Sequence, residues 1–411
     1  MSRRVVITGM GTANPLGHSV PETIRGIKEG RSGVRFMPEW DLVSDLQGRL
    51  GGNVDGLDLR KRYPRKKRRT MGRVALLATY ASEEAVAQAG LGEDVLQSGR
   101  CGIAYGTTSP SSEAMEDFCG KLFTHHTMKG LDGTSYLKFM THTAAANLAQ
   151  FFQVQGRIIP VNSACTTSAQ AIGYGYEAIA AGKQDAMLCG GAEEQHYATA
   201  VTFDLLMATS VRFNDKAAQS PRPFDARRDG LVVGEGAATV VLEALDHALA
   251  RGATPLAEVV GFGTTCDGRH MTANSRSGMR AAMTLALEDA KESPANVDYV
   301  CAHATATDLG DIEESHATYE LFERAVPTAS LKGHMGHTLA ACGGIEVIAC
   351  TAMMRDGFLA KSANLENVDP RCAPLGYVKE LEASQPRLVM SNNFAFGGVN
   401  TSLLLRSVEE A

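Results

Sequence analysis

Two parts of the chain follow the same succession of apolar and polar segments. Short β-rich runs interrupted by Gly-x-Gly occupy residues 5–12 and 259–265. An Ala/Leu-rich stretch with helical spacing comes after each run, at residues 74–89 and 279–290. This matching order predicts that the two parts form related structures.

Both parts continue with a strand and a second helix. The predicted strands, at residues 102–105 and 297–302, end in small residues, and turns then open small-residue helices at 163–181 and 336–354. Strands that alternate with helices of this length are typical of parallel β-α units. We therefore predict an α/β fold made of two duplicated units that meet near residue 250.

Composition and charge narrow the class of protein. The 411 residues are 44 % hydrophobic and 21 % charged, which is ordinary for a globular protein of two or three domains. The net charge of −6 gives no global reason to bind nucleic acid. No apolar run approaches the roughly 18 residues of a membrane span, and the first run reaches glycine before a signal-peptide core can form. We expect a cytoplasmic protein that binds neither nucleic acid nor membrane.

One of the 9 cysteines, Cys165, stands in a sequence that favours chemistry. Ile158, Ile159 and Val161 predict a buried strand before it, and apolar positions at helical spacing over 169–179 predict a helix after it. The free N–H groups and the dipole of a helix N-terminus favour a thiolate at that place. The alternative is a small buried structural cysteine, which is the commonest use of the residue.

Two histidines in the second part favour the catalytic interpretation. His303 directly follows a predicted strand, and His337 starts the helix that corresponds to the one after Cys165. If a pseudo-twofold axis relates the two units, His337 faces Cys165 across a shared cleft. A lone histidine is more often a core or surface residue, but this set fits a cysteine-nucleophile enzyme. We predict no metal site, because the chain has no CxxC pair and the nearest carboxylates belong to another segment.

Longer motifs carry a resemblance to a known family. They are SACTTSAQAI at residue 163, RPFDARRDGLVVGEGA at 222, LKGHMGHTLAACGGIE at 331 and NFAFGGVN at 393. Essentially the whole chain resembles the condensing enzymes of the thiolase fold, and the type II β-ketoacyl-[acyl-carrier-protein] synthases in particular. The resemblance implies a thiolase-like, five-layer α-β-α-β-α architecture. Residues 1–250 are expected to carry the nucleophilic cysteine, and residues 251–411 the two histidines and a lysine.

The resemblance also assigns roles by position. The expected catalytic group comprises the nucleophile, two histidines and the lysine: Cys165, His303, His337 and Lys332. Glu314 is implied as the acidic partner of that lysine, with Asp311 as a further supporting carboxylate. The backbone amides of the nucleophile and of Phe396 are implied to form an oxyanion hole. The other implied positions are the gate of the acyl pocket, the pantetheine contacts and the acyl pocket itself: Phe396, Thr305 with Thr307, and Thr107 with Thr108.

These groups imply a decarboxylative Claisen condensation. The cysteine takes an acyl group from a carrier-protein thioester, malonyl carrier protein loses CO2, and the resulting enolate attacks the acyl-cysteine and lengthens the chain. We expect no cofactor, since the substrates are carried on the phosphopantetheine of acyl carrier protein. The alternative function is a specialised polyketide or aryl-polyene ketosynthase that works with a chain-length-factor-like partner. Ala304 and Asp308 depart from the glycine and proline usual in the family and leave the acyl substrate open.

Two surfaces are expected to bind partners. Residues 60–73 form a basic run without an acidic residue. A solvated face is the common use of such a run, and nucleic-acid binding lacks supporting aromatic residues. The resemblance implies that acidic acyl carrier proteins dock here, on Lys66 and Arg69. It also implies that strand 157–163 pairs with its own copy in a homodimer, while a heterodimer with a ketosynthase-like relative stays open.

Overall fold

The computed structural model describes residues 2–408, and its centre is an 11-stranded sheet in which the same strand order occurs twice. The strands of the first half are, in spatial order, β1 (Val5–Ala13), β8 (Gly236–Ala244), β6 (Ala186–Glu193), β4 (Cys101–Gly106) and β5 (Ile158–Val161). Those of the second half are β9 (Ala257–Cys266), β16 (Val399–Arg406), β15 (Leu388–Ala395), β10 (Tyr299–Cys301), β11 (Pro327–Ala329) and β13 (Gly376–Tyr377). β1 and β9 pair antiparallel and join the halves.

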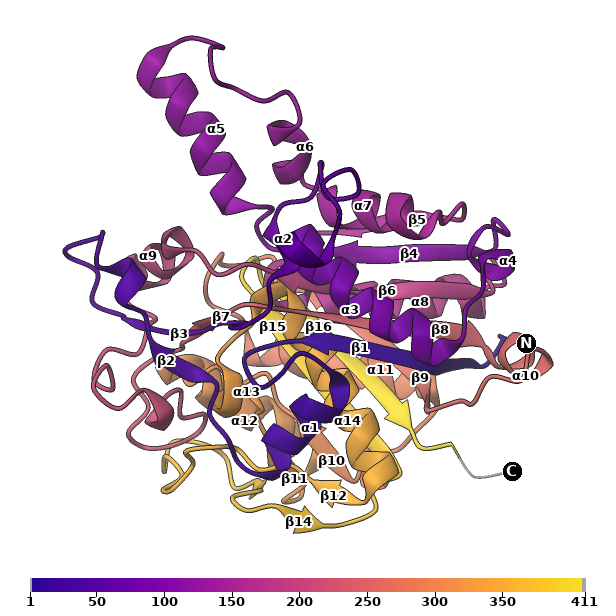
Figure 1. Cartoon of the computed structure of the whole chain (residues 1–411). Coiled ribbons are helices and arrows are strands. Elements are labelled where there is room, and N and C mark those ends of the chain that lie inside the picture. Colours follow the sequence, from indigo (N-terminus) through magenta and orange to yellow (C-terminus); the bar gives the residue numbers. More distant parts are fainter. Residues whose placement is uncertain (1, 409–411) are drawn as a thin grey trace.

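Helices cover both faces of each half-sheet. Helices α8 (Thr167–Ala180) and α14 (Cys342–Asp356) pack against each other between the halves. Helix α3 (Arg73–Ala89) covers the outer face of the first half, and α11 (Arg276–Ala290) with α12 (Asp308–Phe322) covers that of the second (Figure 1). The predicted duplicated five-layer α/β fold is therefore confirmed. The division of the chain at residue 250 stays a prediction.

Shorter elements complete the fold. The helices are α1 (Val20–Lys28), α2 (Leu59–Arg62), α4 (Glu93–Leu96), α5 (Ser112–His125), α6 (Ser135–Phe139), α7 (Thr143–Phe152), α9 (Tyr197–Leu205), α10 (Leu245–Ala250) and α13 (Lys332–Met335). The strands are β2 (Val34–Phe36), β3 (Leu50–Gly52), β7 (Val233–Gly234), β12 (Phe358–Leu359) and β14 (Glu382–Ala383). Within residues 2–408, no helix combines the length and the hydropathy that crossing a membrane requires.

The repeated Gly-x-Gly runs have one physical cause. A Cβ on Gly9 or Gly11 of β1 would lie 2.1 or 2.0 Å from a backbone carbonyl oxygen of α3. A Cβ on Gly261 or Gly263 of β9 would lie 2.1 or 2.0 Å from a carbonyl oxygen of α11. Each outer helix thus approaches its strand too closely for any side chain, and the same close approach occurs in both halves.

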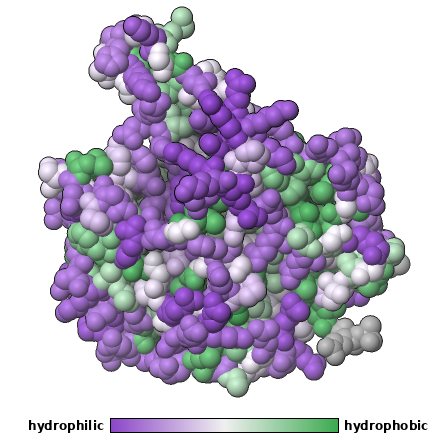
Figure 2. Space-filling model, viewed as in Figure 1, coloured by the Kyte–Doolittle hydropathy of each residue, from purple (hydrophilic) through white to green (hydrophobic). Residues whose placement is uncertain are grey.

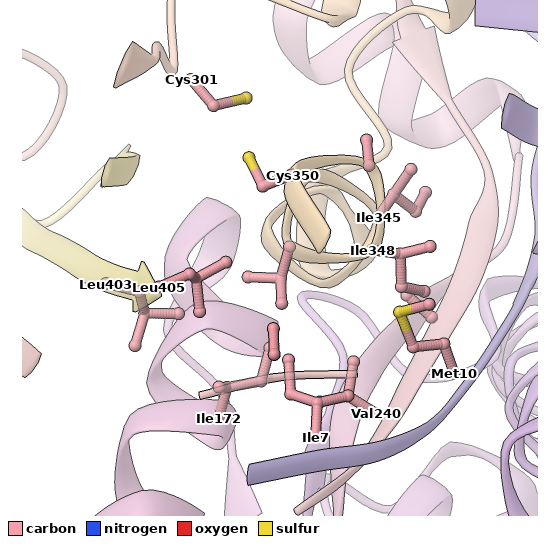
Figure 3. Close-up of a cluster of buried hydrophobic side chains, with 14 of the residues drawn as sticks. Ile7, Met10, Ile172, Val240, Cys301, Ile345, Ile348, Cys350, Leu403 and Leu405 are labelled. Atoms are coloured by element: carbon pink, nitrogen blue, oxygen red, sulfur yellow. The ribbon is translucent and has the colours of Figure 1, made fainter. Parts of the chain in front are cut away.

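The largest apolar core lies around the two central helices. Figure 3 shows side chains of α8 and α14 meeting those of β1, β8 and β16, and all of the labelled residues are buried. The labelled aliphatic residues are Ile7, Ile172, Val240, Ile345, Ile348, Leu403 and Leu405. Burying one such side chain stabilises the fold by about 1.5–3 kcal/mol. This core fixes the positions at which α8 and α14 begin.

The edge strand β5 differs from its sequence prediction. It pairs in parallel with β4 alone, so its other edge is open in the single chain. Ile158 is 42 % exposed and Ile159 is half-buried, whereas only Val161 is buried. The prediction of a buried strand was therefore wrong for the isolated chain, because no further strand covers this edge. Helix α5, which projects from the body beside α6, buries none of its residues either (Figure 1).

An open, apolar strand edge pairs readily with another strand. We predict that the chain sediments as a dimer. Ile158→Glu should yield an inactive monomer, because dimer formation would bury the glutamate charge without a compensating positive charge. Leu285→Glu on α11 is the matched control, since Leu285 is 41 % exposed but lies outside any strand edge. An active monomeric wild-type chain in sedimentation velocity would contradict the dimer, and an inactive wild-type chain would favour a heterodimer.

Candidate active site

Cys165 lies where the sequence predicts it, between a strand and a helix. It occupies the 3-10 turn Ala164–Thr166, which follows β5 and leads directly into α8. Ala164 has φ +49°, a left-handed conformation that costs energy for a residue with a Cβ. The second half has the corresponding turn, Leu339–Ala341, before α14, and Leu339 there has φ +47°. Each half of the fold thus has an equivalent strained turn at the start of its central helix, α8 or α14.

Both predicted histidines lie close to Cys165. His337 Nε2 lies 2.9 Å from Cys165 Sγ. The His303 ring stands edge-on to the His337 ring, with centroids 5.2 Å apart and an angle of 84°. All three side chains are buried. The prediction that His337 faces Cys165 from the other half of the chain is confirmed.

Burial keeps the two imidazoles neutral. Loss of solvent lowers the pKa of both His303 and His337 well below the usual value, and the charge of Lys332 lowers each further. Asn393 Nδ2 lies 3.5 Å from His303 Nδ1, a long contact that is compatible with a proton on Nε2 of that ring. His337 Nδ1 has no hydrogen-bond partner among the described residues, so either tautomer is available to it. Nε2 of His337 can therefore accept the thiol proton or donate an N–H.

The resting state of Cys165 differs from the sequence expectation. Burial raises the pKa of the Cys165 thiol to about 12, and the nearby Lys332 charge offsets this only in part. The carboxylates of Glu193 and Glu346 raise it further. Burial therefore opposes the thiolate that the helix N-terminus was expected to favour. The cysteine is a neutral thiol beside a base.

The acidic partner of Lys332 is Glu346 rather than the predicted Glu314. Lys332 Nζ donates to Glu346 Oε1 at 2.5 Å, and both side chains are buried. The Glu314 carboxylate instead accepts the backbone N–H groups of His303 and Ala304, at 2.8 and 2.6 Å. Because these two bonds occupy both of its oxygens, Glu314 positions the His303 loop. Glu346 ends the motif that begins at residue 331, but the motif by itself does not distinguish Glu346 from Glu314 as the partner of Lys332.

Asp311 supports the same loop from the other side. Its buried carboxylate accepts the backbone N–H groups of Phe224, at 2.8 Å, and of Ala306, at 3.0 Å. Burial raises the pKa of Asp311 to about 6, while the Arg228 guanidinium at 3.7 Å acts in the opposite direction. The predicted supporting position of Asp311 thus corresponds to holding residues that follow His303.

A cavity of about 580 Å³ leads to the cysteine. Most of the predicted binding positions line it together with the reactive side chains: Cys165, His303, His337, Thr305, Thr307 and Phe396. Thr305 and Thr307 lie together, with their hydroxyl oxygens 3.1 Å apart. The Phe396 ring lies 5.8 Å from the ring of Phe203, which also lines the cavity. A slender substrate that makes polar contacts along its length suits a cavity with this lining.

The two residues whose backbone N–H groups are predicted to form the oxyanion hole, Cys165 and Phe396, both line the cavity. Cys165 is in the first turn of its helical segment, and Phe396 directly follows β15. Within residues 2–408, neither N–H donates to a protein acceptor. Gly397 and Gly398, with φ +88° and +71°, make the turn that presents Phe396.

The predicted acyl-pocket threonines do not line this cavity. Thr107 is buried, and its hydroxyl contacts the Ser109 carbonyl at 2.8 Å and Glu193 at 3.3 Å. Thr108 is exposed in the single chain. Both lie beside the open edge formed by β5, which pairs with β4 just before them.

Ala304 and Asp308, the two departures from the family pattern, line the same cavity as the reactive side chains. The Ala304 methyl packs in a small apolar cluster with Phe224 and Leu365. The Asp308 carboxylate pairs with the Arg371 guanidinium at 2.5 Å on the surface. Neither side chain occupies the place of a reacting group.

The predicted docking residues are free cations on the surface. Lys66 and Arg69 are exposed and form no ion pair with any residue between 2 and 408. Arg60 and Arg62, earlier in the same run, pair with Glu113 and with Glu83. Figure 2 shows a strongly hydrophilic surface around α2. The later part of the run therefore keeps its positive charge.

The ligand atoms of Cys165, His303 and His337 lie within 4.8 Å of one another, a spacing that a metal ion can also use. The Lys332 ammonium acts against this, because the charge that lowers the pKa of both imidazoles also repels a cation. Proton and acyl transfer fit this electrostatic environment better.

Comparison with known proteins gives the family. The family model "Beta-ketoacyl synthase, N-terminal domain" matches residues 2–248, and the corresponding C-terminal model matches residues 256–366. The chain belongs to the β-ketoacyl synthase family. It is 36 % identical to 3-oxoacyl-[acyl-carrier-protein] synthase 1 of Escherichia coli K12, over 99 % of this chain and 100 % of that one.

Solved structures agree with this assignment. A β-ketoacyl synthase from Burkholderia phymatum STM815 has a TM-score of 0.96 and 50 % identity, and the match covers 99 % of this chain and 100 % of that one. The ishigamide ketosynthase/chain length factor has a TM-score of 0.92 and 30 % identity, with full coverage of both chains. The thiolase-like ketosynthase fold is thereby shown.

The buried ion pair of this synthase can be tested by substitution. We predict that Lys332→Met destabilises the protein by about 3–5 kcal/mol, because it leaves the Glu346 carboxylate buried and unpaired. Adding Glu346→Met should restore much of this stability. Lys361→Met is the control, since its partner Glu380 is 83 % exposed, and should cost less than about 1 kcal/mol. The free energy of unfolding is measured by chemical denaturation. An equal loss of this free energy in Lys332→Met and in Lys361→Met would contradict the pairing.

Proposed function

We propose that this β-ketoacyl synthase forms an acyl-Cys165 enzyme and condenses the acyl group with malonyl carrier protein. The observation that carries the proposal is the 2.9 Å contact between Cys165 Sγ and His337 Nε2, with the His303 ring at 5.2 Å. A thiol, a neutral base and a second neutral imidazole at the end of one cavity suit acyl transfer followed by carbanion chemistry.

The first half-reaction transfers the acyl group. Cys165 Sγ attacks the thioester carbonyl as its proton passes to His337 Nε2. The carbonyl oxygen becomes an oxyanion that accepts the N–H groups of Cys165 and Phe396. The carbon–sulfur bond to pantetheine then breaks, and the leaving thiolate takes the proton from His337. Thr305 and Thr307 are placed to contact the pantetheine arm in the cavity.

The second half-reaction forms the carbon–carbon bond. Malonyl carrier protein loses CO2 as its carbon–carbon bond breaks, and the electron pair becomes an enolate. With His337 now in its Nε2–H tautomer, the Nε2–H groups of His303 and His337 donate to the enolate oxygen. Because both rings are neutral, they do not readily protonate the carbanion carbon. The carbanion carbon attacks the acyl carbonyl, the bond from that carbon to Cys165 Sγ breaks, and the departing thiolate takes the proton of His337 Nε2–H, which solvent then replaces. The Lys332 charge lowers the pKa of both imidazoles and helps to keep them neutral, and Glu346 holds the Lys332 ammonium.

The numbered type and the acyl substrate are finer assignments. We propose the type II interpretation on the motifs quoted above, although the Escherichia coli relative carries the name synthase 1. A specialised polyketide or aryl-polyene ketosynthase is the second candidate, favoured by Ala304 and Asp308 at positions that usually hold glycine and proline. Initial rates measured with carrier proteins that bear acyl groups of different length and unsaturation distinguish these two candidate functions.

The role of the nucleophile is tested by mass spectrometry of the intact protein after incubation with acyl carrier protein. We predict that Cys165→Ala forms no acyl adduct, because no other described cysteine lies beside two histidines. Cys165→Gln should still decarboxylate malonyl carrier protein, since the two imidazole donors remain. Cys266→Ser, at an exposed cysteine, should form the adduct as the wild type does. An adduct on the Cys165→Ala protein would refute the assignment.

Carrier-protein docking is tested by charge reversal. Lys66→Glu with Arg69→Glu should raise KM for acyl carrier protein and leave small pantetheine thioesters unaffected, because only the carrier protein reaches the patch. The wild-type rate should fall with added salt, which screens charges beyond about 8–10 Å. Lys216→Glu with Lys291→Glu, at exposed positions elsewhere, is the control. An equal loss with both kinds of substrate would place the defect in the fold or the chemistry.

A further inference from the structure

A buried acid that no catalytic step uses ends strand β6. The Glu193 side chain is almost fully buried and accepts three backbone N–H groups. These come from Thr108 at 3.0 Å, from Ser109 at 3.2 Å and from Ala340 at 3.4 Å. The Thr107 hydroxyl adds a contact at 3.3 Å. One carboxylate therefore gathers donors from two segments that are far apart in the sequence.

The two segments adjoin the two reactive turns. Ala340 lies in the 3-10 turn that follows His337 and precedes α14. On the other side, Asn162 Nδ2 donates to the Thr107 carbonyl at 3.0 Å, and Asn162 is three residues before Cys165 in the sequence. Glu193 is thus connected to the His337 turn directly and to the Cys165 turn through one hydrogen bond.

Close packing leaves these segments little freedom. Gly191, two residues before Glu193, would place a Cβ 2.3 Å from the Ala340 carbonyl oxygen. The end of β6 therefore presses directly on the turn that follows His337. A shift of the Glu193 carboxylate is transmitted to that turn rather than absorbed by empty space.

We propose that Glu193 is a positioning residue that holds the Cys165 and His337 turns in the register that brings Sγ and Nε2 to 2.9 Å. A carboxylate suits this task because both of its oxygens accept hydrogen bonds. A glutamine would turn an NH2 group toward backbone N–H donors and lose part of the connection. The inference rests on the proposed function for its kinetic meaning, but the geometry it describes is independent of substrate.

Glu193 also acts on the thiol through its charge. His337 and His303 lie beside the Cys165 thiol. The Lys332 charge lowers the pKa of this thiol, whereas the charges of Glu193 and Glu346 raise it. Replacing Glu193 by a neutral residue removes one raising charge. Burial raises the pKa of Glu193 to about 7, so Glu193 is charged at the alkaline pH where the thiol titrates. The pKa of Cys165 should therefore fall in Glu193→Gln, and a thermal unfolding midpoint at the wild-type value distinguishes this loss of charge from a general loosening that admits water.

The test compares Glu193→Gln with Glu194→Gln. Glu194 is a matched control, because it is also buried but accepts only from Ser111 Oγ, at 3.1 Å, and the Glu113 N–H, at 3.0 Å, at the start of α5. We expect Glu193→Gln to slow acyl transfer about tenfold or more, as small displacements of reacting groups do. The pH midpoint of Cys165 alkylation by iodoacetamide should move to lower pH. Glu194→Gln should leave both measurements at wild-type values.

A second variant tests the connection on the other side. Asn162 is exposed in the single chain but lies at the edge that the predicted dimer covers, so Asn162→Ala is first shown by sedimentation to keep the wild-type oligomeric state. It should then slow acyl transfer without moving the alkylation midpoint, because it removes no charge. Wild-type acyl transfer in either Asn162→Ala or Glu193→Gln would overturn the proposal. Equal losses in Glu193→Gln and Glu194→Gln, with no midpoint shift, would also overturn it. If the wild type itself failed to take an acyl group, the midpoint shift would still support the Glu193 geometry while the proposed function failed.

Discussion

The contact between Cys165 and His337 is the constraint on which the rest of the structure depends. It requires two helices from different halves of the chain to begin within one thiol–imidazole distance of each other. Small residues at the start of α14 allow this approach. A Cβ on Gly343 would lie 2.9 Å from the Ala169 Cβ of α8, and the Gly344 N–H donates to Ser168 Oγ at 2.8 Å. The two halves of the sheet, with their repeated strand order, supply the two equivalent turns, and these glycines let the turns come together.

The burial of the site and the charge of Lys332 both act on the protonation state of the two histidines. A buried ion pair, Lys332 with Glu346, lies near two imidazoles, and His337 must be neutral because its Nε2 accepts the thiol proton. The ammonium lowers the pKa of both rings, and burial acts in the same direction. The thiol meanwhile stays protonated until its neighbouring base takes the proton. The thiol and both imidazoles are therefore uncharged at rest, and the nearest ammonium is held in a buried pair with Glu346, where removing either member is costly.

Much of this arrangement could be predicted from the sequence, because it depends on local patterns. The alternation of strands and helices, the repeated Gly-x-Gly runs and the position of Cys165 at a strand-to-helix joint all follow from residues close together in the chain. The pairing of Lys332 with Glu346 could not be predicted in this way, since Glu314 is equally acidic and only the fold shows that backbone N–H groups occupy its oxygens. The protonated state of Cys165 likewise depends on burial by both halves. The exposure of β5 depends on which chain, if any, covers the edge of the sheet.

The central claim is that these groups form a carbon–carbon bond by decarboxylative condensation. Mass spectrometry of the carrier-protein products tests it most directly, after the purified chain is incubated with an acyl carrier protein and malonyl carrier protein together. We predict a 3-oxoacyl carrier protein whose acyl chain is two carbons longer than that of the starting acyl group, with one CO2 released for each product formed. Release of the free acid without any lengthened product would contradict it.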